Sequence, residues 1–433
     1  MELTAAYPKA VRDRQWYRLD NAGKLYPALS TAKWDSVFRI SAAMKQDIEP
    51  KRLQRAVDSV MPRFVTMNTQ LCKGVFWYYL EENPKRLLIQ EDQIVPCAAL
   101  SWREKNGHLM RVLYAGRRLS VEYFHAITDG AGAMVFLKTL IAEYLRLRGT
   151  SIPCEDGILD LRSKPVATEL EDAFQRMPLP KNIKRTIEGS AYRFPGEKMT
   201  SPHARSITTY CMSASQVKEK AKSIGATLTE YLTAAILLVG YQEQEKENPR
   251  KKLPVRVSVP INMRQVFPTD SLRNCSWFVN PEIAPPFGDL TLESITAQVR
   301  SFMKEALLPE NLYAGIAPNV ASENSLLLRL APLPIKNLVI RSVHKAMGIK
   351  MVTTTLSNLG LFKAPAAMME EIEWVDVVLG PTKGAGTGAA LITTGDRLRL
   401  TYTSNQETPV LPGAFERLLR QEGLSITKEV LWG

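Results

Sequence analysis

The sequence predicts an α/β protein, an α+β sandwich of two subdomains with an active-site channel between them. A chain of 433 residues is too long for one ordinary hydrophobic core. Residues 150–204 are rich in proline and lack a clear hydrophobic period, which is typical of a linker between packed halves. We therefore expect an N-terminal subdomain over residues 1–149, a linker over 150–204 and a C-terminal subdomain over 205–433.

The first subdomain contains a strand, a tight turn and a helix within residues 118–148. Apolar residues alternate over 118–124, which predicts a half-buried strand. From residue 134 onward, apolar residues recur three or four positions apart, which predicts a helix. His125 stands where the strand ends, and Asp129 and Gly130 stand where the helix begins.

A histidine at the end of such a strand is well placed for proton transfer. The end of a strand in an α/β sheet faces a crevice, and a neutral imidazole there accepts a proton near pH 7. Asp129 would fix either the ring of His125 or the turn that carries the ring. The alternative is structural, because Asp before a helix is a common N-cap. Of the four histidines in the chain, His125 alone lies in such a strand-turn-helix.

Residues 125–130, His-Ala-Ile-Thr-Asp-Gly, resemble the H-x-x-x-D-G motif of the chloramphenicol-acetyltransferase-like acyltransferases. These include condensation domains of non-ribosomal peptide synthetases, polyketide-associated acyltransferases and, as the most similar group, bacterial alcohol acetyltransferase-type proteins. Many members carry two adjacent histidines, of which the second is the base. Here Phe124 takes the first place and His125 the second. The D-F-G-W-G motif of the plant members is absent. The resemblance implies two chloramphenicol-acetyltransferase-like subdomains.

Three later segments extend the resemblance. Residues 260–264, Pro-Ile-Asn-Met-Arg, resemble a P-[VI]-[ND]-x-R segment whose arginine often pairs with the motif aspartate, so Arg264 is expected to pair with Asp129. Residues 357–360 resemble an S-N-x-G strand end at the channel, where Ser357 and Asn358 would donate to an oxyanion. The alternative for these two residues is a strand-end turn. The closing order of strand, glycine-rich loop, hairpin and helix is the least specific likeness.

The reaction implied by the resemblance is transfer of an acyl group from acyl-coenzyme A to an alcohol or amine. His125 would be the general base, and Asp129, Gly130 and Arg264 would support the site. Acyl-coenzyme A would be a co-substrate, with no permanently bound cofactor. One alternative is an enzyme that takes its acyl group from an acyl carrier protein. Another is a non-catalytic binding protein that keeps the fold, which Phe124 in the first motif position leaves open.

Composition excludes several other classes. The five cysteines are scattered without a C-x-x-C pair, which argues against a metal site and predicts that Cys275 is buried and inert. The net charge of +12 comes from dispersed basic residues without a nucleic-acid motif, and it suits the phosphates of coenzyme A. No apolar run is long enough for a membrane span. The N-terminus lacks a signal pattern, so we expect a cytoplasmic protein.

The remaining pattern predicts alternating strands and helices. Strands are expected over residues 36–41, 75–80, 109–114, 206–212, 255–259, 351–360, 389–394 and 397–404. Helices are expected over residues 50–61, 213–225, 227–245, 291–307, 324–344 with a break near Pro332, and 414–421. The glycine-rich residues 379–388 do not open a helix, so we interpret them as a flexible loop rather than a phosphate-binding motif.

Overall fold

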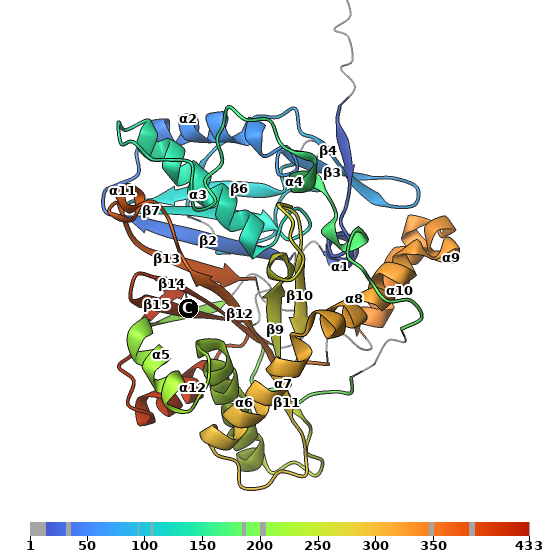
Figure 1. The fold of residues 1–433 in the computed structure, drawn as a ribbon, viewed down its shortest axis with the longest axis vertical. Coiled ribbons are helices and arrows are strands. Elements are labelled where there is room, and N and C mark those ends of the chain that lie inside the picture. The colour runs from blue at the N-terminus through green and yellow to red at the C-terminus, as the bar shows by residue number, and fades with distance from the viewer. Residues whose placement is uncertain are drawn as a thin grey trace, which may run out of the picture.

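The computed structural model describes residues 14–31, 36–93, 95–104, 107–183, 188–199, 205–345, 350–380 and 386–432. Helices and sheets are mixed throughout, and two large sheets lie one above the other (Figure 1). Each sheet has its own buried apolar cluster. The predicted α/β class is therefore confirmed.

The N-terminal sheet has five strands in the order β13-β2-β7-β6-β5. They are β13 (Ile372–Leu379), β2 (Val37–Met44), β7 (Arg118–Phe124), β6 (Met110–Ala115) and β5 (Gln90–Glu91). β7 is the central strand and pairs antiparallel with both neighbours. His125 therefore follows the middle of this sheet.

Both faces of β7 are buried, so the prediction of a half-buried strand was wrong. Glu122 points into the protein and accepts hydrogen bonds from Arg39 and Arg111. A charged residue in an alternating pattern indicates a solvent-facing position only if no oppositely charged residue is buried next to it. Here Arg39 on β2 and Arg111 on β6 neutralise Glu122 inside the protein.

One strand of the N-terminal sheet comes from the C-terminal half of the chain. β13 pairs antiparallel with β2 along seven positions. The apolar cluster beneath this sheet accordingly includes Phe362, Met368 and Val375. The predicted subdomains 1–149 and 205–433 thus share a sheet, and their division stays a prediction.

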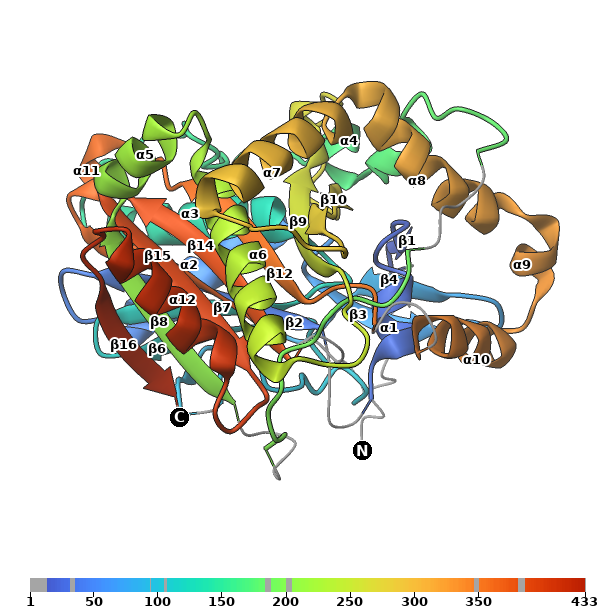
Figure 2. The same ribbon diagram turned by 90° about the horizontal axis from the view of Figure 1, so that it is seen from below.

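The C-terminal sheet follows the order β10-β9-β12-β14-β15-β8-β16, with β11 beside β9. Its strands are β8 (Ser206–Ser213), β9 (Val255–Asn262), β10 (Ser276–Val279), β11 (Glu282–Ile283), β12 (Thr354–Leu361), β14 (Thr387–Thr394), β15 (Arg397–Ser404) and β16 (Thr427–Trp432). The helices on it are α5 (Ala214–Ser223), α6 (Leu228–Glu247), α7 (Leu292–Ala306) and α12 (Val410–Gln421) (Figure 2). A capping box between Thr227 and Glu230 opens α6.

The N-terminal sheet is covered by α2 (Pro50–Val60), the short η1 (Met61–Arg63), α3 (Gly130–Arg146) and α11 (Ala366–Met369). A third, small sheet has the order β1-β4-β3 and contains β1 (Trp16–Arg18), β3 (Thr69–Lys73) and β4 (Tyr78–Glu82). The prediction of a strand over residues 75–80 was wrong at its start. Val75 and Phe76 lie exposed in the turn between β3 and β4.

Four helices form an arm at one side of the molecule, shown at the right of Figure 2. They are α1 (Leu25–Leu29), α8 (Pro309–Asn324), α9 (Leu326–Leu330) and α10 (Leu333–Val343). The predicted break near Pro332 separates α9 from α10. No single helix in the described ranges is long and apolar enough to cross a membrane, and only α5 and α6 taken together, bent by 78°, pass on length and composition.

The segment expected as a linker is largely irregular, with only α4 (Ala167–Leu170), the short η2 (Ala173–Gln175) and one isolated bridge at Lys198 in its described part. It is nevertheless anchored to both halves. Glu169 is buried and accepts two hydrogen bonds from Arg63, at 2.6 and 2.7 Å. Phe174 and Tyr192 belong to the apolar cluster of the C-terminal sheet. The segment therefore packs as part of both halves.

Candidate active site

His125 leaves the central strand of the N-terminal sheet. Its backbone N–H donates to the carbonyl of Ser36 over 2.8 Å, and the chain then turns into α3. Phe124, which takes the place of a first motif histidine, is fully buried and stacks on Trp102 with ring centroids 5.5 Å apart. It packs in the core of the N-terminal half, while the His125 ring points the other way.

The ring of His125 is held by Asn274. Nδ1 lies 2.9 Å from the side-chain oxygen of Asn274. The amide nitrogen of Asn274 faces two acceptors, the carbonyl of His125 at 2.9 Å and the carboxylate of Asp20 at 3.2 Å. The amide is therefore oriented with its oxygen toward the ring, and Nδ1 must carry the proton.

This tautomer leaves a lone pair on Nε2, and no hydrogen bond from a described residue occupies that atom. Tyr26, in α1, stacks on the ring with centroids 4.7 Å apart, and Phe38 tilts against it at 4.9 Å. Two aromatic rings thus fix the plane of an imidazole that is ready to accept a proton.

Asp20 is the buried anchor of this arrangement. Its carboxylate accepts from the backbone N–H of Gly23 at 2.6 Å and of Asn274 at 3.3 Å, and it lies 3.6 Å from Nε of Arg273. The N-terminal segment thereby fixes a side chain of the C-terminal half. Sequence reasoning missed Asp20 and Asn274, because neither lies in a motif and 254 residues separate them.

Asp129 fixes the turn, and its hydrogen bonds go to groups other than the imidazole. Its Oδ1 accepts from the backbone N–H groups of Ala131 and Gly132, so it is the N-cap of α3. Its Oδ2 accepts from Arg264 at 2.8 Å, from the backbone of Cys275 at 2.8 Å and from Ser276 at 2.9 Å. Burial alone would raise the pKa of this carboxyl, but Arg264 and these hydrogen bonds outweigh it and lower the pKa.

Arg264 forms the ion pair that the sequence predicts. Besides Asp129, its guanidinium donates to the backbone carbonyls of Ser271 at 2.8 Å and Arg273 at 2.6 Å. Burial opposes its charge, yet Asp129 raises the pKa of the guanidinium above its ordinary value. Arg264 therefore ties the loop that carries Asn274 to the turn that carries His125.

The two glycines at the start of α3 differ in how closely they are packed. A Cβ at Gly130 would meet Leu359 at 3.5 Å, which is an ordinary contact. A Cβ at Gly132 would come within 2.2 Å of the carbonyl oxygen of Leu272 and 2.3 Å of Thr128 Oγ1. Thr128 also donates to that carbonyl over 2.7 Å. The close approach of the halves thus depends on Gly132, which sequence reasoning did not single out.

Ser357 and Asn358 lie on β12, next to Leu359, which faces Gly130. The amide of Asn358 donates to Thr229 at 2.9 Å and accepts from the backbone of Gly360 at 2.8 Å. Gly360 has a φ of +77°. These bonds shape the strand end, which favours the turn interpretation for Asn358. The Ser357 hydroxyl makes no hydrogen bond to any described residue.

Three other sequence features, Cys275, the candidate metal ligands and the glycine-rich loop, add little to the candidate site. Cys275 is buried, and burial raises the pKa of its thiol to about 12, which fits an inert thiol. Within the described ranges, no group of three His, Cys, Asp or Glu side chains is arranged to hold a metal ion. Of the glycine-rich loop predicted over 379–388, residues 381–385 lie outside the described ranges.

No protein-family model and no curated protein sequence matches this chain. Solved structures do match over nearly its whole length. Polyketide synthase associated protein 5 from Mycobacterium tuberculosis is 14% identical with a TM-score of 0.60, covering 96% of this chain and 98% of its own. A variant of the starter condensation domain of rhizomide synthetase, in complex with C8-CoA, is 16% identical with a TM-score of 0.60, covering 94% and 93%.

The trichothecene 15-O-acetyltransferase TRI3 from Fusarium sporotrichioides is 10% identical with a TM-score of 0.61, covering 94% of this chain and 95% of its own. The chain has the condensation-domain and chloramphenicol-acetyltransferase-like fold. The family resemblance carried by residues 125–130 is thereby confirmed at the level of the fold. In this condensation-domain-like fold, β13 crosses from the second half to complete the first sheet, and His125 lies at the end of the central strand of that sheet.

Proposed function

We propose that this protein transfers an acyl group from acyl-coenzyme A to a small alcohol or amine, with His125 as general base. The supporting observation is the bond between His125 and Asn274, which puts the proton on Nδ1 and leaves Nε2 as the base. A general base must be oriented toward the acceptor and accessible to it, and that bond fixes the orientation of the ring.

In the proposed step, the acceptor O–H or N–H gives its proton to Nε2 of His125 while its oxygen or nitrogen attacks the thioester carbonyl. The tetrahedral oxyanion collapses, the carbon–sulfur bond breaks, and the coenzyme A thiolate takes the proton from the imidazolium. Direct transfer needs no acyl-enzyme. Ser357, whose hydroxyl is not committed to a described residue, is the proposed donor to the oxyanion.

Asp129 and Arg264 support this function indirectly. They hold the His125 turn against the loop of Asn274, and Gly132 lets the two approach. The choice of coenzyme A as donor is supported by the similar condensation domain solved with C8-CoA and by the positive charge of this chain. A donor held on an acyl carrier protein is the second candidate, since other structures of this fold are condensation domains. A cytoplasmic location is part of the proposal.

The test is release of free thiol from short, medium and long acyl-coenzyme A donors with alcohol and amine acceptors. His125→Ala should lower turnover by about a hundredfold or more, the usual scale for loss of a general base, without lowering the melting temperature. His344→Ala, at the end of α10, is the matched control and should keep its rate. A His125→Ala protein that transfers acyl groups at the wild-type rate would exclude the mechanism.

Two further outcomes separate the alternatives. Turnover with an acyl group on a carrier protein, but not with free acyl-coenzyme A, would show that the carrier protein is the donor. A protein that binds acyl-coenzyme A tightly and turns over neither donor would be the non-catalytic binding protein.

A further inference from the structure

Two helices of the arm, α9 and α10, expose apolar side chains. Leu326 and Leu330 on α9 are 69% and 62% exposed, and Leu338 on α10 is 67% exposed. Ile335 and Val339 lie beside Leu338 at helical spacing and are also exposed. We call these five residues the apolar arm face. Single exposed apolar residues need no explanation, but five of them on two consecutive helices indicate a surface that binds something.

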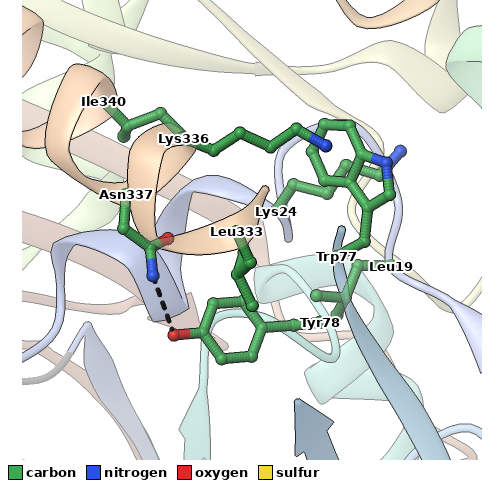
Figure 3. Close-up of a pocket in the computed structure, with 8 residues that line it drawn as sticks. All are labelled: Leu19, Lys24, Trp77, Tyr78, Leu333, Lys336, Asn337 and Ile340. Atoms are coloured by element: carbon green, nitrogen blue, oxygen red, sulfur yellow. Dashed lines mark hydrogen bonds between the residues drawn. The ribbon is translucent and has the colours of Figure 1, made fainter. Parts of the chain in front are cut away.

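α10 has a second face that is fully committed to the protein. Leu333 and Lys336 are buried there, and Asn337 donates to the hydroxyl of Tyr78 over 3.2 Å (Figure 3). Arg341 donates to the backbone carbonyl of Ala28 in α1. One side of α10 therefore packs against the rest of the protein, and the opposite side exposes apolar residues to solvent.

The turn between β3 and β4 is bonded to α10. The backbone N–H of Leu333 donates to the carbonyl of Val75 at 2.9 Å, and Nζ of Lys336 donates to the carbonyl of Phe76 at 2.9 Å. Lys336 also reaches the ring of Trp77 (Figure 3), with Nζ 3.6 Å from the ring centroid. Val75, 72% exposed, and Phe76, 42% exposed, are thus held beside α10 and add exposed apolar side chains next to the arm.

The charged residues of α9, α10 and the chain that follows them as far as residue 369 are all basic. Residues 324–369 contain no Asp or Glu, whereas Arg329, Arg341 and Lys345 are exposed there. None of these three is in an ion pair with a described residue. The adjoining acid, Glu323, is engaged by Lys24 and Asn21. The surface is therefore an aliphatic patch with basic residues at its edge and no acidic residue of its own helices.

We propose that the apolar arm face and the β3–β4 turn dock onto the surface of a lipid bilayer that contains anionic lipids. Leu, Ile and Val enter the boundary of the acyl chains, and Arg329 and Lys345 meet the headgroup charge. A protein partner is the weaker fit, because protein interfaces favour aromatic residues and Met, and five of these seven residues are Leu or Val. This inference is independent of the proposed reaction.

The experiment is flotation of the full-length protein with vesicles of phosphatidylglycerol and, separately, of phosphatidylcholine. Wild-type protein should float with phosphatidylglycerol vesicles, bind phosphatidylcholine much more weakly, and dissociate as salt is raised. The double variant Leu330→Glu and Leu338→Glu should lose at least about tenfold in vesicle affinity. Arg329→Gln with Lys345→Gln should lose roughly fivefold for each charge removed, and only on anionic vesicles.

The matched control is Val166→Glu with Val430→Glu, which adds the same charge at residues 51% and 63% exposed elsewhere in the protein. It should bind vesicles as wild type does. Equal vesicle binding by the Leu330→Glu, Leu338→Glu variant would overturn the proposal. The proposal would also be overturned if the wild-type protein does not bind vesicles but sediments as a dimer, and the Leu330→Glu, Leu338→Glu variant sediments as a monomer. The surface would then join two copies of the chain.

Discussion

The side-chain oxygen of Asn274 lies 2.9 Å from Nδ1 of His125, and the carboxylate of Asp20 holds the same amide from its nitrogen end. The three residues, Asp20, His125 and Asn274, come from the start, the first third and the middle third of the chain. Together they choose one tautomer of the histidine, which is the property that a general base requires.

Asn274→Ala should lower turnover by roughly 10- to 100-fold, the scale found when the hydrogen-bond partner that orients a metal-bound histidine is removed. The ring would then be free to move its proton to Nε2. Nitrogen chemical shifts of labelled histidine measure the tautomer directly and should report protonated Nδ1 in the wild type. A variant that keeps this tautomer and full turnover would show that Asn274 only packs.

Asp129 and Arg264 should be strongly coupled in stability. Asp129→Asn leaves a largely buried guanidinium without its anion, so it should cost about 3–5 kcal/mol of unfolding free energy. Arg264→Met strands the carboxylate in the same way. Urea unfolding of both single variants and the double variant should give a double variant much less destabilised than the sum, and simple additivity would disprove the coupling.

The same pair predicts an acid dependence of stability. The pKa of Asp129 is lowered in the folded protein, so the stabilisation is complete above the ordinary pKa of about 4 and is lost as the pH falls through the folded value. Urea midpoints measured from pH 7 downward should therefore drop more steeply for wild type than for Asp129→Asn. Parallel curves would rule out Asp129 as the group that titrates.

The glycines of α3 offer a matched pair of substitutions. Gly132→Ala places a Cβ against the backbone of Leu272 and should cost about 1–3 kcal/mol, as overpacking does. Gly130→Ala meets only Leu359 at an ordinary distance and should change stability by less than about 1 kcal/mol. Thermal melts compare the two. Equal melting temperatures would mean that the loop of Leu272 moves away at no cost.

The local parts of the site could be predicted from sequence. The strand, the turn with His125 and the helix of residues 118–148 each have a short-range signal, and the structure places them where the pattern does. The pairing of Arg264 with Asp129 was predicted from a family resemblance and is present. The roles of Asp20 and Asn274 could not be predicted, because their contact depends only on how the halves dock.

Other misses have separate physical causes. The aromatic run at residues 75–77 has high β propensity, but contacts with α10 hold it as an exposed turn, so tertiary packing decides its conformation. α8 was missed because Pro318 lies inside it and its hydrophobic pattern is weak. β13 was missed because its apolar residues are interrupted by Glu373 and Asp376, and Asp376 faces buried Arg399.

The crossing of β13 has a consequence for how this protein is made. β2 gains its outer partner only from residues 372–379, so the first sheet cannot close until most of the chain has left the ribosome. Until then β2 offers an open edge of unpaired backbone groups, which is a template for aggregation. The first half of the nascent chain therefore stays partly assembled until β13 is translated. β13 begins at Ile372, some 330 residues after the start of β2 at Val37.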